Sequence, residues 1–283
     1  MQQKFQLDLY TLSKINIYYL SPAIVFSKLY TSNLPLSLFG GVLLFSASLA
    51  VIMYVISILV GKISRLNLRK QTAFTHSVLF YNSANFGIPV NELVFQKDPF
   101  AASIQVCVMI FQNFLVYSYG VFALNSLDKN KLKALLEYFK LPLFYALFLG
   151  LTLNIFQVEL PEMIVKPIDY VANAMIALAL LTLGCQIAAF KPNFRDIHMY
   201  ISLLLRLLIA PALAFILLKF LNLEGVLAQA LFISTAMPTA VNSSIIAQEY
   251  NNEPQYAAQT VVMSTLVSSL TVTIIIYLAM QVF

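Results

Sequence analysis

The chain has 283 residues and a mass of 31.7 kDa, and 60% of its residues are hydrophobic while only 10% are charged. A soluble domain has roughly 45–50% apolar and about 25% charged residues, and it needs that charge to cover its surface. The composition therefore excludes soluble enzymes, nucleic-acid-binding proteins and disordered regions. It predicts an integral membrane protein whose surroundings are the lipid bilayer.

Long apolar segments decide between helices and a β-barrel. A membrane-spanning helix needs about 20 mainly apolar residues, whereas a barrel strand needs about ten with strict alternation. Stretches such as Phe39 to Val60 and Tyr256 to Phe283 are continuously apolar without that alternation. We therefore predict an all-α polytopic membrane protein. Its nine expected spans cover residues 11–30, 35–60, 71–95, 100–124, 141–158, 167–189, 199–220, 226–248 and 256–281.

The distribution of positive charge predicts the orientation of these spans. The chain carries 17 Lys and Arg against 12 Asp and Glu, and cytoplasmic loops collect Lys and Arg. Most of these 17 fall in the N-terminal segment and after the second, fourth and sixth spans. We expect a multi-pass protein of the cell (plasma) membrane, with the N-terminus of this chain in the cytoplasm and the C-terminus outside. The connection 125–140 is expected to be a cytoplasmic linker with a short interfacial amphipathic helix.

Two of the expected spans contain a proline among polar residues. The third contains residues 82–91, with the sequence NSANFGIPVN, and the eighth contains residues 234–244, with the sequence STAMPTAVNSS. Proline removes a hydrogen bond from a helix and clashes with the preceding turn. The freed backbone groups then need a partner or a water-lined cavity. Each span alone is equally compatible with a kinked helix whose polar residues bind neighbouring helices.

The pairing of these two spans favours a functional interpretation. They are five spans apart and run in opposite predicted directions. Interrupted spans at corresponding positions of two inverted halves are the best sequence indication of a transporter's binding site near the middle of the bilayer. We therefore expect a substrate site formed by Asn82, Asn85, Gly87, Pro89, Pro238, Thr239, Asn242 and Ser243.

The two interrupted spans resemble those of the auxin efflux carrier family, a branch of the bile acid/arsenite/riboflavin transporter superfamily. The similarity lies in residues 82–90 and 237–244, in the stretch 249–266, and in residues 12–23, which resemble the family's second span. The resemblance implies ten spans in a five-plus-five inverted repeat with two broken, crossing helices. Spans one, two, six and seven of the family form a scaffold that often dimerises, so a homodimer is implied as well.

The resemblance also implies how this chain is organised. Only about ten polar residues precede the segment that resembles the family's second span, so the family's first helix is expected to be missing. Nine spans with a cytoplasmic start would then remain. They form a first repeat in residues 1–124, which lacks its first helix, a linker in 125–140 and a second repeat in 141–283.

The polar residues within the spans limit which kinds of substrate the protein could bind. No Asp or Glu lies at the centre of a span, so a carboxylate pair for a cationic substrate is not evident. Interrupted helices expose backbone amides and positive helix ends, which suit a carboxylate. Asn82, Asn85 and Asn242 can donate hydrogen bonds without carrying a charge. Because members of the family carry organic anions, the resemblance implies a malate- or malonate-like carboxylate moved by alternating access.

Five further residues lie in apolar spans. Three of them have both a functional and a structural interpretation, and the two cysteines have a structural one only. Arg206 is expected either to contact the anion or, as we favour, to extend to the cytoplasmic interface or pair with another group. Gln112 and Asn113 either line the substrate cavity or form hydrogen bonds between helices. Cys107 and Cys185 are interpreted as packing residues, and no metal or cofactor is expected.

An ion or small-solute channel is the main alternative to a transporter, because polar, broken helices also line selectivity filters. An enzyme is not expected, since the chain has no His-Glu-x-x-His motif, no Gly-x-Ser-x-Gly motif and no intramembrane Asp pair. The sequence leaves open the identity of the substrate, the direction of transport, and whether a proton or a sodium ion is coupled.

Overall fold

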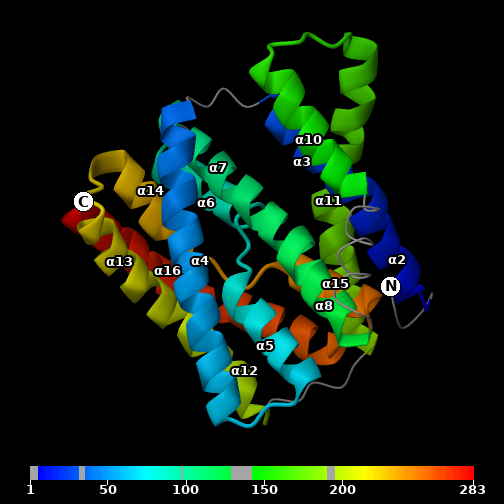
Figure 1. The fold of residues 1–283 in the computed structure, drawn as a ribbon, viewed down its shortest axis with the longest axis vertical. Coiled ribbons are helices and arrows are strands. Elements are labelled where there is room, and N and C mark those ends of the chain that lie inside the picture. The colour runs from blue at the N-terminus through cyan, green and yellow to red at the C-terminus, as the bar shows by residue number, and fades with distance from the viewer. Residues whose placement is uncertain (1–5, 32–35, 97, 129–141, 190–194) are drawn as a thin grey trace. The chain divides into compact units, whose positions relative to one another are not determined.

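The computed structural model describes the chain apart from residues 1–5, 32–35, 97, 129–141 and 190–194. In the described part the regular structure is helical, and β-structure is limited to an isolated bridge (Figure 1). Every expected span coincides with a helix, a continuous run of helices or a pair of helices. The prediction of an all-α polytopic membrane protein is confirmed. The helix expected in the linker 125–140 lies, beyond residue 128, outside the described residues.

The helices form two compact units, each built from three separate stretches of the chain. The first unit is composed of Met1–Ser32, Asn113–Pro192 and Val241–Ala258, and the second of Asn33–Gln112, Asn193–Ala240 and Gln259–Phe283. Both units therefore draw on both halves of the sequence. This division by packing differs from a division into repeats and does not test it, so the expected repeats in 1–124 and 141–283 stay a prediction.

The first unit contains the expected spans 11–30, 141–158 and 167–189. Their helices are α2 (Leu9–Ile15), η1 (Asn16–Leu20), α3 (Ser21–Tyr30), α10 (Pro142–Ile155) and α11 (Glu162–Ala189). The unit also holds η2 (Val116–Gly120), α8 (Val121–Asp128) and α15 (Val241–Glu249). Both η1 and η2 are π-helical turns inside longer helices, a feature that is frequent at functional sites.

Helix α3 packs closely against α10 in this unit. A Cβ atom added to Gly150 would lie 3.1 Å from Cβ of Leu29, so the glycine allows a close approach where the two helices meet. The Asn154 side chain donates a hydrogen bond to the Tyr30 carbonyl at 2.9 Å across the same interface. Small residues and polar contacts of this kind drive helix association in a bilayer, where lipid tails are as apolar as leucine.

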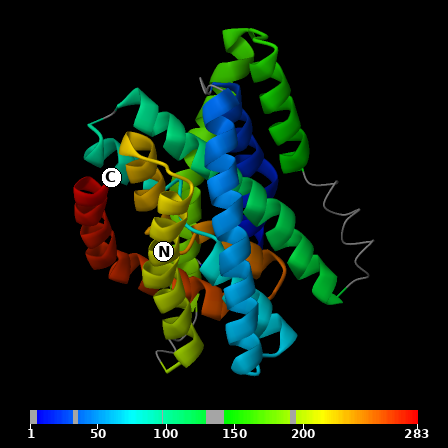
Figure 2. The ribbon, with the colours of Figure 1, turned by 60° about the vertical axis from the view of Figure 1, so that its left-hand side comes forward.

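The second unit contains the expected spans 35–60, 199–220 and most of 256–281, together with most of the two interrupted spans. The helices that lie wholly or mostly in this unit are α4 (Leu36–Ile63), α5 (Leu68–Leu79), α6 (Gly87–Val94), α7 (Pro99–Leu115), α12 (Ile197–Leu204), η3 (Leu205–Ile209), α13 (Ala210–Phe220), α14 (Gly225–Thr235) and α16 (Pro254–Val282). Figure 2 shows the long helix α4 in blue turning into α5 in cyan, and the two helices pack side by side.

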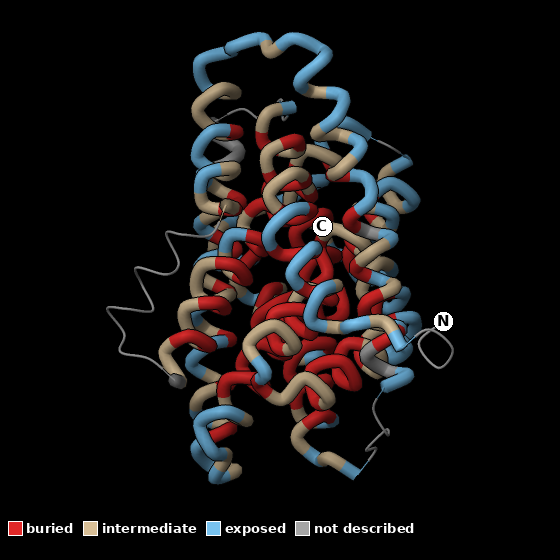
Figure 3. Tube along the Cα trace, turned by 90° about the vertical axis from the view of Figure 1, so that its right-hand side faces the viewer, coloured by how far each residue is buried: buried red, intermediate tan, exposed pale blue. Residues whose placement is uncertain are grey.

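The outer sides of these helices suit lipid. Along many helices in Figure 3, buried and exposed residues alternate with the helical turn, so one side is covered and the other is not. The exposed positions include large apolar side chains such as Leu44 and Val51 on α4 and Leu270 and Ile274 on α16. Within the described residues, the helices long and apolar enough to cross a bilayer cover Gly40–Ile63, Pro99–Leu127, Glu162–Cys185, Ile197–Phe220 and Pro254–Val282.

At the expected cytoplasmic end of the second unit, Asp196 links the beginnings of α12 and α5. Its carboxylate accepts a hydrogen bond from the His198 amide at 3.1 Å and forms an ion pair with Lys70 at 2.6 Å. Burial by itself raises the pKa of Asp196, but the hydrogen bond and charge of Lys70, together with His198, outweigh it and hold the pKa below its ordinary value.

Candidate substrate site at two broken helices

Both proline-containing spans are interrupted, as expected. The third expected span consists of α5 and α6 with residues 80–86 between them, and we call this segment the first break. The eighth consists of α14 and α15 with residues 236–240 between them, and this is the second break. The chain therefore leaves the helical conformation twice within predicted spans, where the backbone needs other hydrogen-bond partners.

The two prolines lie differently relative to these breaks. Pro238 is inside the second break, where its missing amide removes a helical hydrogen bond. Pro89 follows the first break and lies in the first turn of α6. A proline costs no hydrogen bond in a first turn, because the first four amides of a helix have no partner within it. Pro89 therefore marks the beginning of α6 rather than the point of interruption.

The breaks cross and pair through their backbones in the second unit. Tyr81 and Thr239 form an antiparallel bridge. The Asn82 amide donates to the Pro238 carbonyl at 2.8 Å, and a second backbone hydrogen bond of 2.9 Å closes the other side of the bridge. These bonds satisfy groups that the interrupted helices leave without partners. The expectation of two broken, crossing helices is thus confirmed.

Thr239 is fastened by both of its polar groups. Its hydroxyl donates to the Ser77 carbonyl in the last turn of α5 at 2.9 Å, and its amide donates to the Ser264 hydroxyl of α16 at 3.1 Å. The residue is buried, with 1% of its surface exposed. The structure therefore gives Thr239, which we expected at the substrate site, a set of contacts that hold the crossing together.

Arg206 lies in the π-helical turn η3 and is fully buried next to the crossing, with 1% of its surface exposed. One terminal nitrogen of its guanidinium donates to the Val78 carbonyl at 3.2 Å, and the other donates to the Thr235 carbonyl. The guanidinium carbon also lies 4.6 Å from the centre of the Tyr81 ring, in a cation–π contact. Among the described residues, no acidic side chain pairs with it.

We favoured two outcomes for Arg206, and the first of them, extension to the cytoplasmic interface, is wrong. The side chain turns into the protein, because two backbone carbonyls and an aromatic face offer it partners there. Pairing with another group is correct, but the partners are carbonyls. Sequence alone gives no indication of this, since backbone carbonyls have no residue signature.

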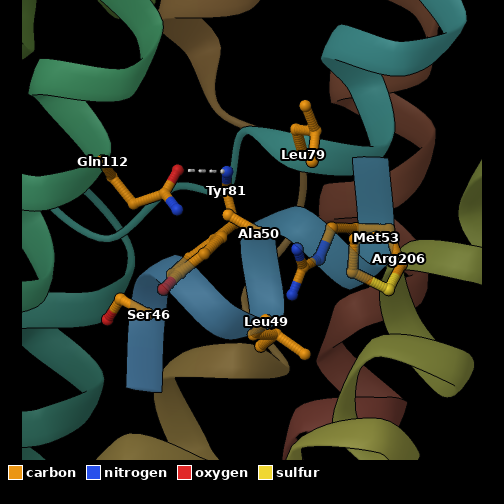
Figure 4. Close-up of a pocket in the computed structure, with 8 residues that line it drawn as sticks. All are labelled: Ser46, Leu49, Ala50, Met53, Leu79, Tyr81, Gln112 and Arg206. Atoms are coloured by element: carbon orange, nitrogen blue, oxygen red, sulfur yellow. Dashed lines mark hydrogen bonds between the residues drawn. The ribbon is translucent and has the colours of Figure 1, made fainter. Parts of the chain in front are cut away.

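A small cavity lies between Arg206 and the crossing (Figure 4). It has room for about one water molecule. Two buried donors in its lining, the Nε atom of Arg206 and the hydroxyl of Ser46, have no partner in the structure. Gln112, one of the expected site residues, accepts a hydrogen bond from the Tyr81 amide at 3.2 Å. The lining consists of Ser46, Leu49, Ala50, Met53, Leu79, Tyr81, Gln112 and Arg206.

The first break leaves polar groups unused. The Asn85 amide donates to the side-chain oxygen of Asn82 at 3.1 Å, which shapes the turn that leads into α6. The side-chain oxygen of Asn85 itself is buried without a partner. Because an unpaired buried polar group costs about 1–3 kcal/mol, such a group indicates a missing partner.

Gln105 is a polar residue at this break that the sequence interpretation missed. Its amide nitrogen donates to the Ser83 carbonyl at 2.7 Å, and its oxygen accepts a 3.4 Å hydrogen bond from Ser234. A Cβ atom added to Gly87 would lie 2.4 Å from that nitrogen, so the expected site residue Gly87 makes room for Gln105. Gln105 precedes Gln112 by seven residues, a spacing that places both on one face of α7 and could have revealed it.

Three of the expected site residues belong to the first unit. Asn242 in the first turn of α15 donates to Asn113 of α7 at 3.4 Å, and Ser243 is buried beside it in the sequence. This contact matches one of the two interpretations of Asn113, hydrogen bonding between helices. The expected contacts of Asn113, Asn242 and Ser243 with a substrate stay predictions.

Comparison with known proteins agrees with this architecture. A sequence profile of the membrane transport proteins, the family that includes the auxin efflux carriers, matches residues 9–276. The chain belongs to this family. The match extends over nearly the whole chain and includes both breaks, so the resemblance that the broken spans indicated is confirmed. The family is one of membrane transport proteins.

A related protein is an uncharacterized transporter of Methanocaldococcus jannaschii. It is 25% identical to this chain over 197 residues, which make up 68% of this chain and 63% of the relative. The match thus spans a little less than two thirds of the relative's length. The relative is described as a transporter with no stated substrate.

Proposed function

We propose that the protein is a secondary transporter for a small organic anion, such as a malate- or malonate-like carboxylate, in the cell membrane. The observation that carries this proposal is the crossing of two broken helices in a member of a transport family. At such a crossing, backbone and side-chain groups that a continuous helix would hide become available to a hydrophilic substrate inside the bilayer.

The charges near the crossing support an anionic substrate. The only charged side chain in the lining of the cavity is the cation Arg206. The first break offers amides instead of carboxylates, chiefly Asn82 and Asn85, and amides bind an anion without holding it as tightly as a second cation would. A substrate carboxylate at the first break would receive a hydrogen bond from the side-chain nitrogen of Asn85, and the Asn85 oxygen, which lacks a partner in the structure, would accept one from a substrate hydroxyl such as that of malate.

The division of the described chain into two compact units favours alternating access over a channel. A body that carries the substrate and a body that stays fixed are what such a mechanism needs. A homodimer, a coupled proton or sodium ion and the orientation with the N-terminus in the cytoplasm remain parts of this proposal that rest on the sequence.

Counterflow in proteoliposomes tests the proposal. Vesicles loaded with unlabelled malate or malonate should accumulate the labelled acid above its outside concentration, and the initial rate should saturate. An uptake rate that rises linearly with concentration, in vesicles that show no counterflow, would instead identify the alternative, a channel.

A thermal-shift screen is the second experiment. Purified protein is heated with mono- and dicarboxylates at several pH values and sodium concentrations, because a ligand of the folded state raises its apparent melting temperature.

A further inference from the structure

Two helices of the second unit end at Arg206. Val78 lies in the last turn of α5, and Thr235 is the last residue of α14. The last four carbonyls of a helix have no partner within it, and together they carry a negative partial charge of about half an elementary charge. The Arg206 guanidinium donates to one such carbonyl of each helix.

Five of the remaining carbonyls at these ends accept hydrogen bonds from neutral donors, three in α14 and two in α5. In α14 the Thr235 hydroxyl and the amides that follow the helix supply them. In α5 the Phe80 amide and the Thr239 hydroxyl do the same. Arg206 is therefore the charged group that the structure places on both negative helix ends. Its unit charge is about equal and opposite to the sum of the two partial charges.

We propose that Arg206 is a specificity-determining residue that makes the crossing accept anions by cancelling the negative ends of α5 and α14. Without it, two negative helix ends would face the crossing in a region of low dielectric constant, where they repel an anion strongly. The proposal rests on the proposed function, since it presupposes an anionic substrate. It differs from direct recognition of the substrate, because the guanidinium acts through its charge on the helix ends.

Charge-dependent binding separates this role from a structural one. The test measures the dissociation constants of malonate and of its monoamide, two ligands of similar shape that differ by one charge. In Arg206→Gln, each unit of ligand charge should weaken binding on the order of tenfold, as expected for unit charges ~10 Å apart in a protein-like dielectric. Malonate should therefore lose about a hundredfold and the monoamide about tenfold.

Arg206→Lys and Lys219→Gln complete the experiment. The first keeps the charge and loses the two-pronged geometry, so it should retain the wild-type ratio of the two dissociation constants. The second removes the same charge from the exposed end of α13, where Lys219 donates to the Val282 carbonyl at 3.3 Å, and should leave the ratio unchanged. If Arg206→Gln does not fold, a changed ratio in Arg206→Lys still overturns the proposal.

Equal losses for malonate and its monoamide in Arg206→Gln would overturn the proposal, and so would a changed ratio in Arg206→Lys. The second outcome would assign Arg206 to the substrate through its hydrogen bonds. A wild-type protein that binds neither ligand, nor any carboxylate of the thermal screen, would reject the proposed function itself. The two failures are therefore distinguishable.

Discussion

The first and the second break solve the same problem in different ways. Both interrupt a span, and both leave the preceding helix ending on Arg206. The second break is closed: Thr239 uses its amide and hydroxyl, and the Pro238 carbonyl accepts the Asn82 amide. The first break keeps a buried side-chain oxygen on Asn85 without a partner.

This difference separates a structural from a binding role. Polar groups that already have partners inside the protein stabilise the crossing and would lose those bonds on binding a substrate. An unsatisfied acceptor such as the Asn85 oxygen gains a bond when a ligand that carries a donor, such as the hydroxyl of malate, arrives. We therefore place the substrate at the first break. We assign to the second break the role of holding the two crossing segments together. The following changes test this division, from the largest expected effect to the smallest.

Asn85→Ala should have the largest effect on transport. Loss of a hydrogen bond to a charged substrate corresponds to about 1.5–3 kcal/mol, so initial uptake rates in proteoliposomes should fall roughly tenfold to a hundredfold. The apparent melting temperature should stay at or above that of the wild type, because the variant removes a buried oxygen that has no partner. Uptake at the wild-type rate would move the site away from the first break.

Gly87→Ala should lower the stability of the folded protein. The added Cβ atom would lie 2.4 Å from the Gln105 amide nitrogen, so Gln105 must give up its hydrogen bond to Ser83 or move the break. We expect a loss of about 2 kcal/mol in the free energy of unfolding, as overpacking in a dense interior costs. The measurement is the thermal shift of purified protein. The matched control is Gly184→Ala, since nothing lies within 4 Å of a Cβ atom at that position.

Thr239→Val should destabilise the second break. It removes the hydroxyl that donates to the Ser77 carbonyl, and loss of this hydrogen bond should cost about 1 kcal/mol. Thr260→Val is the control, because the Thr260 hydroxyl is buried without a partner and its loss should be neutral or stabilising. If both variants melt at the same temperature, the hydroxyl of Thr239 does not stabilise the crossing.

Asp196→Asn should have the smallest effect, about 0.5 kcal/mol, since it weakens a cap and an ion pair at the end of the unit. The folded state holds the pKa of Asp196 below its ordinary value of 3.8, against the effect of burial and because of Lys70. The stabilisation is therefore present above pH 3.8 and is lost as the pH falls through the lower folded-state pKa.

A pH series of melting curves measures this effect. The difference in melting temperature between the wild type and Asp196→Asn should shrink as the pH falls below 3.8. The exposed pair of Glu162 and Lys166 serves as a control, because Glu162→Gln removes an exposed ion pair, which contributes little to stability. A difference that grows in acid would show that Asp196 is protonated more easily when folded.

The membrane class, the helical fold and both interruptions could be predicted from sequence. Apolar segments of spanning length and clusters such as those around Pro89 and Pro238 are local patterns, and the physical constraint of the bilayer leaves few structures that satisfy them. Family membership followed from the same residues. Gln105 could also have been found, since its spacing from Gln112 is a local pattern.

The partners of buried polar groups could not be predicted. Whether Arg206 leaves the protein or turns inward depends on two carbonyls from residues 78 and 235, which are distant in sequence. The same holds for Thr239, whose partners come from α5 and α16. A polar residue in an apolar span indicates that a partner exists, and only the packing of the helices decides which one.

The amino-acid sequence by itself determined that this is an integral membrane protein whose spans are helices and that two of these spans are interrupted. Both properties could be predicted because hydropathy and proline act within a single segment. The tertiary structure decided that the second break is closed and the first is not. It also decided that a buried arginine joins the ends of α5 and α14. These outcomes depend on which backbone groups meet in space, and the hydrogen bonds between them carry no signature in either segment alone.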